Sequence, residues 1–106
     1  MIDIEEKYLQ IVQNILLSHV PQCEVRLFGS RFTGTAHKYS DIDLAIIDKD
    51  KLDEKIIIDL KEFFAESDLP YQVDVLDWHA ISPKFRQMIE TGFEVIQKRI
   101  SRELHE

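Results

Sequence analysis

Apolar positions along the chain recur at two different spacings, and the wider spacing marks the helices. Between Ile4 and Val20 apolar residues return every three or four positions, which predicts an amphipathic helix. The segment 51–66 repeats this spacing and predicts a second helix. Ser82-Pro83 has the composition of an N-cap followed by proline at the first helical position, so a third long helix is expected to begin there and to end near Gly92.

The shorter spacing marks strands. Apolar and polar residues alternate with a period of two in 24–28, 41–47 and 71–76, and a short edge strand is expected over 93–96. Ser30–Thr33 is expected to open a short helix, and the segment 34–40 is expected to be a polar loop. The pattern predicts an α/β (α+β) fold: one domain over residues 1–97, with a small mixed sheet of three to four strands flanked by helices. A polar C-terminal tail is expected over 98–106.

Composition excludes several classes of function. The 106 residues suit one compact domain, and the net charge of −7 disfavours direct contact with a nucleic-acid backbone. No apolar run is long enough for a membrane span, and the N-terminal sequence lacks the pattern of a secretory signal, so a cytoplasmic location is expected. Cys23 is the single cysteine, which excludes an internal disulfide. We expect Cys23 to be a packed thiol without a catalytic role.

The candidate chemistry lies in the stretch FGSRFTGTAHKYSDIDLAI, Phe28 to Ile46. Gly29-Ser30 ends one predicted strand, and Asp41 and Asp43 share a face of the next because side chains alternate along a strand. Asp74 occupies the third strand. An Asp-x-Asp triplet alone is weak evidence, since ten aspartates in 106 residues give about one by chance.

The chain contains a second such triplet, Asp48-Lys49-Asp50, which follows the strand and precedes a helix. Aspartates in that position commonly form turns and caps, so we assign it a structural role. Asp77 is excluded from the site because strand parity turns it away from Asp74.

Three converging carboxylates repel one another, and a divalent cation relieves that repulsion. Mg²⁺ binds through a few carboxylates plus phosphate oxygens, and two such ions stabilise the attacking and leaving oxygens of a phosphoryl displacement. Gly29 would let the backbone approach phosphate, and Ser30 would offer a hydroxyl. Asp74 would accept the proton of an incoming hydroxyl or hold the metal that activates it.

These residues resemble the nucleotidyltransferase motif of the DNA polymerase β superfamily, specifically the minimal nucleotidyltransferases of small prokaryotic proteins. The resemblance extends over nearly the whole chain. It implies transfer of a nucleoside monophosphate, commonly AMP from ATP, to an acceptor hydroxyl with release of pyrophosphate. It further implies that Asp41, Asp43 and Asp74 are catalytic and bind two Mg²⁺ ions, with Mn²⁺ as an alternative, and that Gly29 and Ser30 contact the phosphates.

Proteins of this kind are often paired with an all-helical HEPN protein and act as antitoxins, some by adenylylating a tyrosine of that partner. The resemblance therefore implies a HEPN-type partner, and self-association into a homodimer is a further option. One departure from the family pattern is Thr33, where many relatives carry a second basic residue. Triphosphate binding then depends on Arg31 and Lys38, for each of which a solvated surface charge is the competing interpretation.

Two other functions remain open at this point. The first is a binding module that neutralises a helical partner by occlusion, with little or no catalysis. The second is adenylylation of a small molecule such as an aminoglycoside, which is disfavoured because the chain lacks the added domain that those enzymes usually carry. Among the remaining side chains, we assign His37 to the surface, Trp78 to partly buried packing, and four phenylalanines to the core: Phe63, Phe64, Phe85 and Phe93.

Overall fold

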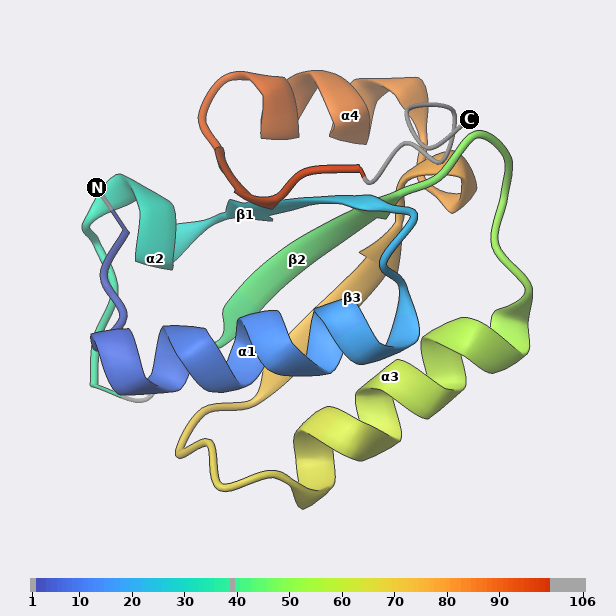
Figure 1. Ribbon diagram of the computed structural model, residues 1–106. Helices are drawn as coiled ribbons and strands as arrows, with labels where there is room; N and C mark the ends of the chain where they lie inside the picture. The colour runs from blue at the N-terminus through green and yellow to red at the C-terminus, as the bar shows by residue number, and fades with distance from the viewer. Residues whose placement is uncertain (1, 39, 100–106) are drawn as a thin grey trace.

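The computed structural model describes residues 2–38 and 40–99 (Figure 1). Each predicted helix and strand is present, with ends that differ by a few residues, and a short 3₁₀ helix, η1, is added after the third strand. In chain order the elements are α1 (Glu6–His19), β1 (Glu24–Phe28), α2 (Ser30–Thr33), β2 (Ile42–Ile47), α3 (Glu54–Glu66), β3 (Val73–Asp77), η1 (Trp78–Ala80), α4 (Pro83–Glu90) and β4 (Glu94–Gln97).

The strands form a single mixed sheet in the order β3-β2-β1-β4. β1 pairs antiparallel with both β2 and β4, whereas β2 pairs parallel with β3. A parallel pair needs a long crossover connection, and α3 supplies it between β2 and β3. This architecture confirms the predicted α/β class with a small mixed sheet.

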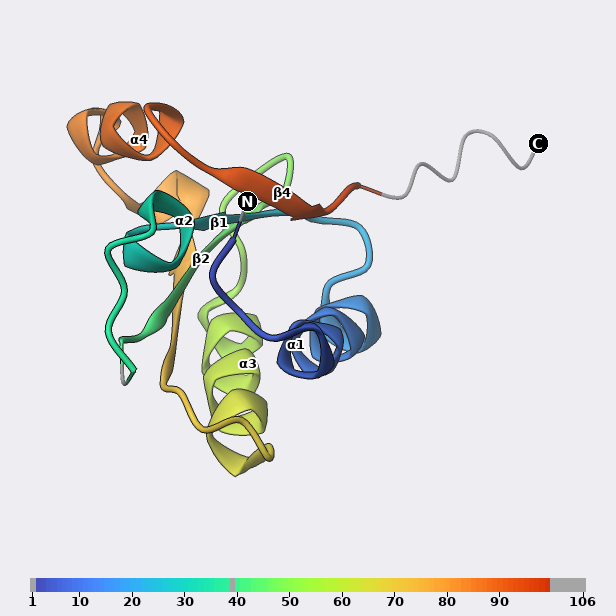
Figure 2. The same ribbon diagram turned by 90° about the vertical axis from the view of Figure 1, so that its left-hand side faces the viewer.

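The two faces of the sheet are covered by different helices, as Figure 2 shows from the side. α1 and α3 pack on one face and bury the main core, while α4 lies over the other. The main core takes Val12, Leu16, Leu60 and Phe64 from the helices and Val25, Leu27, Ile42, Leu44, Ile46, Val73 and Val75 from the strands. The smaller cluster under α4 is built on Phe28, Ala45 and Ile89. Alternate residues of β1 and β2 thus enter opposite clusters, which is the consequence of their period of two.

Local capping explains where two helices begin. The Ser82 side chain accepts a hydrogen bond from the backbone N–H of Phe85, so α4 begins at Pro83 as predicted. The Asp53 carboxylate accepts a hydrogen bond from the N–H of Lys55, so α3 begins at Glu54 and is shorter than the predicted 51–66. Apolar spacing alone does not locate a cap, which explains the difference.

Two of the four phenylalanines assigned to the core are exposed. Phe64 is buried, but 51% of Phe63 and 38% of Phe85 are accessible. Phe63 lies beside the His19 ring at 4.2 Å, and Phe85 makes an edge contact with Phe28. The prediction was wrong for Phe63 because it neighbours Phe64 on the helix, and adjacent residues point about 100° apart.

The end of the chain lies only partly within the described residues. Arg99 forms an ion pair with Asp48, with 3.3 Å between Nη2 and Oδ1. The remainder of the predicted tail, 100–106, lies outside the described residues. Within 2–38 and 40–99, no helix has both the length and the apolar character needed to cross a membrane.

Leu16 and Leu17 offer a test of this packing because they are neighbours with opposite environments. Leu16 is fully buried, whereas 52% of Leu17 is accessible. We expect Leu16→Ala to lower the free energy of unfolding by about 2–5 kcal/mol, through lost burial and a cavity. Leu17→Ala should change it by less than about 0.5 kcal/mol. Urea denaturation followed by circular dichroism measures both, and equal losses would contradict the assigned orientation of α1.

Candidate active site

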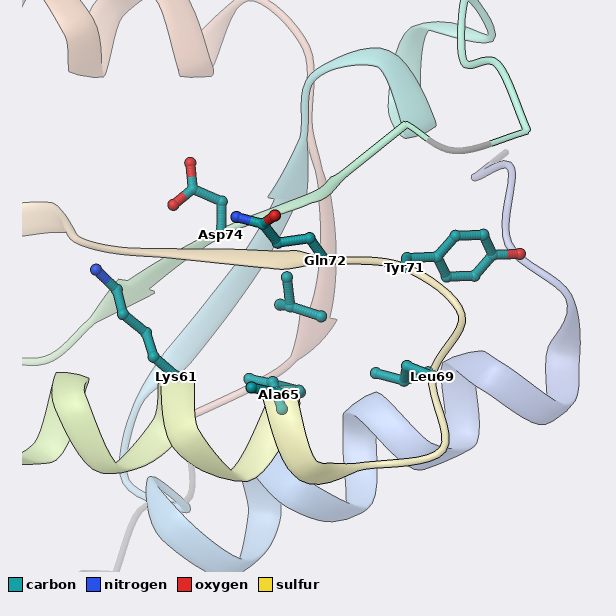
Figure 3. A pocket seen from close by; sticks show the side chains of 8 residues that line it. Lys61, Ala65, Leu69, Tyr71, Gln72 and Asp74 are labelled. Carbon is teal, nitrogen blue, oxygen red and sulfur yellow. The ribbon is translucent and has the colours of Figure 1, made fainter.

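Two of the predicted catalytic carboxylates are direct neighbours across the sheet. In the parallel register of β2 and β3, Asp43 pairs with Asp74. Figure 3 shows that the Asp74 carboxylate rises from the side of β3 opposite α3. Asp43 lies on this same face, since Ala45, two residues further on, packs under α4. The pair therefore lies on the α4 side of the sheet.

Asp41 completes the group from just outside the strand, because β2 begins at Ile42. Its side chain is exposed, as is that of Asp74, whereas Asp43 is half-buried between them. Burial, together with the negative charges of Asp74 and Asp41, raises the pKa of Asp43 to about 6. The charges of Asp74 and Asp41 are thus close enough to act on Asp43.

Gly29 is required by its contact with this group. Its φ is 77°, a left-handed conformation that glycine adopts without strain. A side chain on Gly29 would also run into the carboxylate of Asp43, with the Oδ2 atom in the way. The turn backbone consequently lies against the carboxylates, and Ser30 begins α2 directly beside them. The structure thus brings the Gly-Ser turn and the Asp-x-Asp strand into one site.

The carboxylate group fits a divalent metal as a partial ligand set. Carboxylate oxygens are the donors that Mg²⁺ and Mn²⁺ prefer, and the pKa of Asp43 is raised first by burial and then by the negative charges of Asp74 and Asp41, a repulsion that a cation would relieve. Across the described residues, no three His, Cys, Asp or Glu side chains form a cluster that by itself holds an ion. Mg²⁺ is commonly bound by one or two carboxylates completed by substrate phosphate oxygens, and the site matches that pattern.

Arg31, which was predicted either to contact the triphosphate or to be a solvated surface charge, is buried in the structure. It is 5% exposed, so the interpretation as a solvated surface charge is wrong. Its guanidinium donates hydrogen bonds to the carbonyl oxygens of Asp3, His37, Lys38 and Ser40. The donors predicted for triphosphate are engaged by the protein's own backbone in this structure.

Lys38 and His37 lie in the loop between α2 and β2 and have exposed side chains. The exposure of His37 agrees with its assignment to the surface. Lys38 stays the basic residue predicted to contact the triphosphate.

A pocket that was not predicted from the sequence opens beside Asp74. It has a volume of about 420 Å³ and lies between α3 and the outer edge of β3. Figure 3 shows the residues around it: Lys61, Ala65, Leu69, Tyr71, Gln72 and Asp74. Because the lining combines a helix with a strand that is distant in sequence, only the folded chain assembles it.

The residues excluded from the site have structural roles. Asp77 is buried, and its carboxylate accepts hydrogen bonds from the N–H groups of Leu52 and His79. Asp48, the first aspartate of the second triplet, accepts hydrogen bonds from the N–H of Lys49 and from Gln22, in agreement with a structural role for this residue. Trp78 is partly buried and lies against the guanidinium groups of Arg26 and Arg86.

Cys23 is buried, and burial raises the pKa of its thiol to about 12. A thiol that stays protonated at neutral pH is a poor nucleophile, in agreement with the predicted packing role.

A mixed sheet that presents paired aspartates beside a Gly-Ser turn is the arrangement expected of a nucleotidyltransferase. Residues 6–101 match the family model of polymerase β nucleotidyltransferases, and the chain belongs to this family. It is 49% identical over 98 residues to the probable protein adenylyltransferase MntA of Haemophilus influenzae. The match covers 92% of this chain and 86% of that relative.

Solved structures with a similar fold are toxin–antitoxin complexes. A toxin–antitoxin structure with AMP-PNP superposes with a TM-score of 0.73 at 28% identity, covering 93% of this chain and 77% of the other. A complex of tri-AMPylated Shewanella oneidensis HEPN toxin with MNT antitoxin gives a TM-score of 0.60 at 26% identity, covering 83% and 71%. The fold is therefore that of a minimal nucleotidyltransferase.

Gly29 and Gly34, the two glycines with positive φ on either side of α2, provide a test of the turn. Gly29→Ala introduces a collision with Asp43 and places alanine at φ 77°, ψ −156°, a conformation essentially restricted to glycine, whereas Gly34→Ala introduces only the milder strain of the αL conformation at φ 83°, with no atom within 4 Å of the new methyl group. Gly34→Ala should lose about 1–2 kcal/mol of stability, and Gly29→Ala should lose more. We expect Gly29→Ala alone to lose nucleotidyl transfer, by about 100-fold or more, since a 1 Å displacement of a catalytic group has that effect. Equal transfer rates in the two variants would contradict this role.

The raised pKa of Asp43 predicts how stability depends on pH without metal. Between pH 4 and 6 the folded state retains a proton that the unfolded chain has lost, so the Asp43 contribution falls as pH rises through this window. In EDTA, Asp43→Asn should be more stable than wild type at pH 7.5, by about 1–3 kcal/mol, and the difference should vanish below about pH 4. Thermal denaturation across pH measures this, with the exposed Asp50→Asn as control.

Proposed function

We propose that this protein is a metal-dependent adenylyltransferase that transfers AMP from ATP to a hydroxyl group of a HEPN-type partner protein, as the antitoxin of a toxin–antitoxin pair. The observation that carries the proposal is the half-buried Asp43, flanked by Asp41 and Asp74 and touching the backbone of the Gly29 turn. The similarity to the probable protein adenylyltransferase MntA of Haemophilus influenzae over nearly the whole chain supports AMP as the transferred group.

Each residue of the site has a definite task in this reaction. Gly29 and Ser30 hold the β- and γ-phosphates against the turn, where the backbone approaches closely. Lys38, on the adjacent loop, neutralises phosphate charge. Asp74 accepts the proton of the acceptor hydroxyl, whose oxygen forms a bond to the α-phosphorus while the bond to the β-phosphate oxygen breaks and pyrophosphate leaves.

The carboxylates of Asp41, Asp43 and Asp74 would hold two Mg²⁺ ions, or Mn²⁺ in their place, together with the phosphate oxygens. When bound, such ions neutralise charge on the attacking and leaving oxygens of an in-line displacement. The negative charge gathered at Asp43 sets the preference of this site for cations. Below about pH 6 a proton competes for Asp43, and metal affinity is expected to fall accordingly.

The pocket beside Asp74 is the place that we propose for the acceptor. Asp74 belongs to the pocket lining, but its carboxylate rises from the side of β3 opposite α3, so an acceptor side chain would have to extend past the outer edge of β3 to bring its hydroxyl to the general base. The pocket combines the aliphatic surface of Leu69 and Ala65 with the polar groups of Gln72 and Lys61. That mixture suits an amphipathic aromatic alcohol such as a tyrosine side chain.

The proposal is tested with the protein, Mg²⁺ and a HEPN toxin of the kind present in the similar solved complex, using ATP labelled at either the α- or the γ-phosphate. Only the α label should pass to the partner, because pyrophosphate carries the γ label away. Asp74→Asn should reduce the transfer rate by about 10²–10⁴-fold, as expected for loss of a general base. Asp50→Asn, from the second Asp-x-Asp triplet, should behave like wild type. Transfer of the γ label would contradict adenylylation.

The Asp43→Asn and Asp50→Asn variants distinguish catalysis from occlusion, which is the main alternative function. If AMP transfer neutralises the toxin, cells that produce the HEPN partner together with the Asp43→Asn variant of this protein will not grow. Cells that produce the partner together with the wild-type protein or the Asp50→Asn variant will grow. Full protection by Asp43→Asn, with a stable complex on gel filtration, would show that neutralisation requires binding alone.

A further inference from the structure

We propose that Arg31 is a positioning residue of the active site, which together with Tyr71 aligns the loop that leads into Asp41 with the segment that leads into Asp74. This inference rests on the proposed function, because it assigns Arg31 a task in arranging the carboxylates that hold the metal. It replaces the contact with triphosphate that the sequence suggested for Arg31.

One side of the guanidinium holds the loop. Nη2 donates hydrogen bonds to the carbonyl oxygens of Ser40, His37 and Lys38, at 3.0, 3.2 and 3.3 Å. Nε adds a bond of 3.3 Å to the same Ser40 oxygen. Ser40 directly precedes Asp41 in the chain, so these bonds determine where the backbone of Asp41 begins.

The guanidinium also lies over the ring of Tyr71, with 4.3 Å between its central carbon and the ring centroid. Tyr71 comes three residues before Asp74, and the next carbonyl, that of Gln72, accepts a hydrogen bond from the N–H of Ile42. The edge of the Tyr71 ring in turn contacts Tyr8 of α1. A single side chain thus connects the segments that enter β2 and β3.

A third set of hydrogen bonds connects Arg31 to the N-terminal segment at Asp3. The N–H of Asp3 donates to the carbonyl oxygen of Arg31 at 2.7 Å, and Nη1 of Arg31 donates to the Asp3 carbonyl oxygen at 3.1 Å. Arg31 belongs to α2, which begins immediately after Gly29. The orientation of the turn and that of the loop are therefore coupled through one short helix.

Burial of a guanidinium is costly, and here it is compensated without a carboxylate. Arg31 takes part in none of the ion pairs between described residues, and its donors face carbonyl oxygens. The planar fork of arginine reaches several oxygens at once, whereas a lysine ammonium is a compact charge that cannot bridge them. The position therefore requires the shape of arginine as well as its charge.

The positioning role is tested first on the loop itself, by limited trypsin digestion of the full chain without metal or nucleotide. Cleavage after Lys38 reports on the loop, and cleavage after the exposed Lys61 of α3 reports on global opening. Arg31→Met and Arg31→Lys should raise the ratio of the cleavage rate after Lys38 to that after Lys61 by about tenfold or more. Both variants remove hydrogen bonds that hold the loop, whereas α3, which lies wholly within the described residues, makes no hydrogen bond to Arg31. An unchanged ratio in both variants would overturn the inference.

Arg86→Met is the matched control. Arg86 also donates to a backbone carbonyl, that of Trp78, and also lies against an aromatic ring, but it connects α4 to η1. Its loss should leave the ratio unchanged. Tyr71→Phe keeps the ring under the guanidinium, so its cleavage ratio should resemble that of wild type. Tyr71→Leu removes the ring, so its ratio should resemble that of the Arg31 variants. The reverse order would contradict the role of the ring.

A second measurement connects the loop to the metal. Titration with Mn²⁺ alone, followed by electron paramagnetic resonance, should give a dissociation constant about 10–100-fold weaker in Arg31→Met than in wild type, the size of effect typical of groups that orient metal ligands. If Arg31 instead contacted triphosphate, the variant would raise the KM for ATP and leave Mn²⁺ binding unchanged. Absence of Mn²⁺ binding in wild type would contradict the proposed metal site, while the trypsin ratio would still decide the positioning role.

Discussion

The repulsion between Asp43 and Asp74 is the constraint around which the site is organised. The parallel register of β2 and β3 places these carboxylates side by side, and Asp43 is half-buried as well. The fold holds them there because the opposite face of both strands is locked into the core by Leu44 and Val75. Like charges in this position destabilise the protein on its own, and a functional site commonly contains such unfavourable groups.

One face of the sheet carries the main core, and the other carries the carboxylates of the candidate active site. α1 and α3 cover one face completely enough to bury the main core, and most of the hydrophobic stabilisation lies there. On the other face α4 covers only the cluster around Phe28, Ala45 and Ile89. The carboxylates occupy the part of this face that is left accessible, so a substrate can reach them without disturbing the core.

Arginine 31 extends this organisation to the segments before the strands. The strands themselves are held by ladder hydrogen bonds, but the described residues of the loop, 34–38 and 40, have no such ladder. Its carbonyl groups converge on the buried guanidinium instead. The positions of Asp41 and of the Gly29 turn thus depend on one polar side chain, in contrast to the apolar packing that supports Asp43 and Asp74.

The sequence by itself determined the helices and the strands, because these follow from local periodicity and from residues such as Gly29 and Pro83 with restricted backbone preferences. It also placed Asp41 and Asp43 close together in the chain, although Asp41 lies just before the strand. It also made Asp74 a candidate, through its place in an alternating segment. Only the tertiary structure decided that Asp74 pairs with Asp43, since strand order and register depend on contacts between distant segments. For the same reason, only the folded chain revealed that Arg31 is buried against carbonyl oxygens, that Phe63 is exposed, and that a pocket opens beside Asp74.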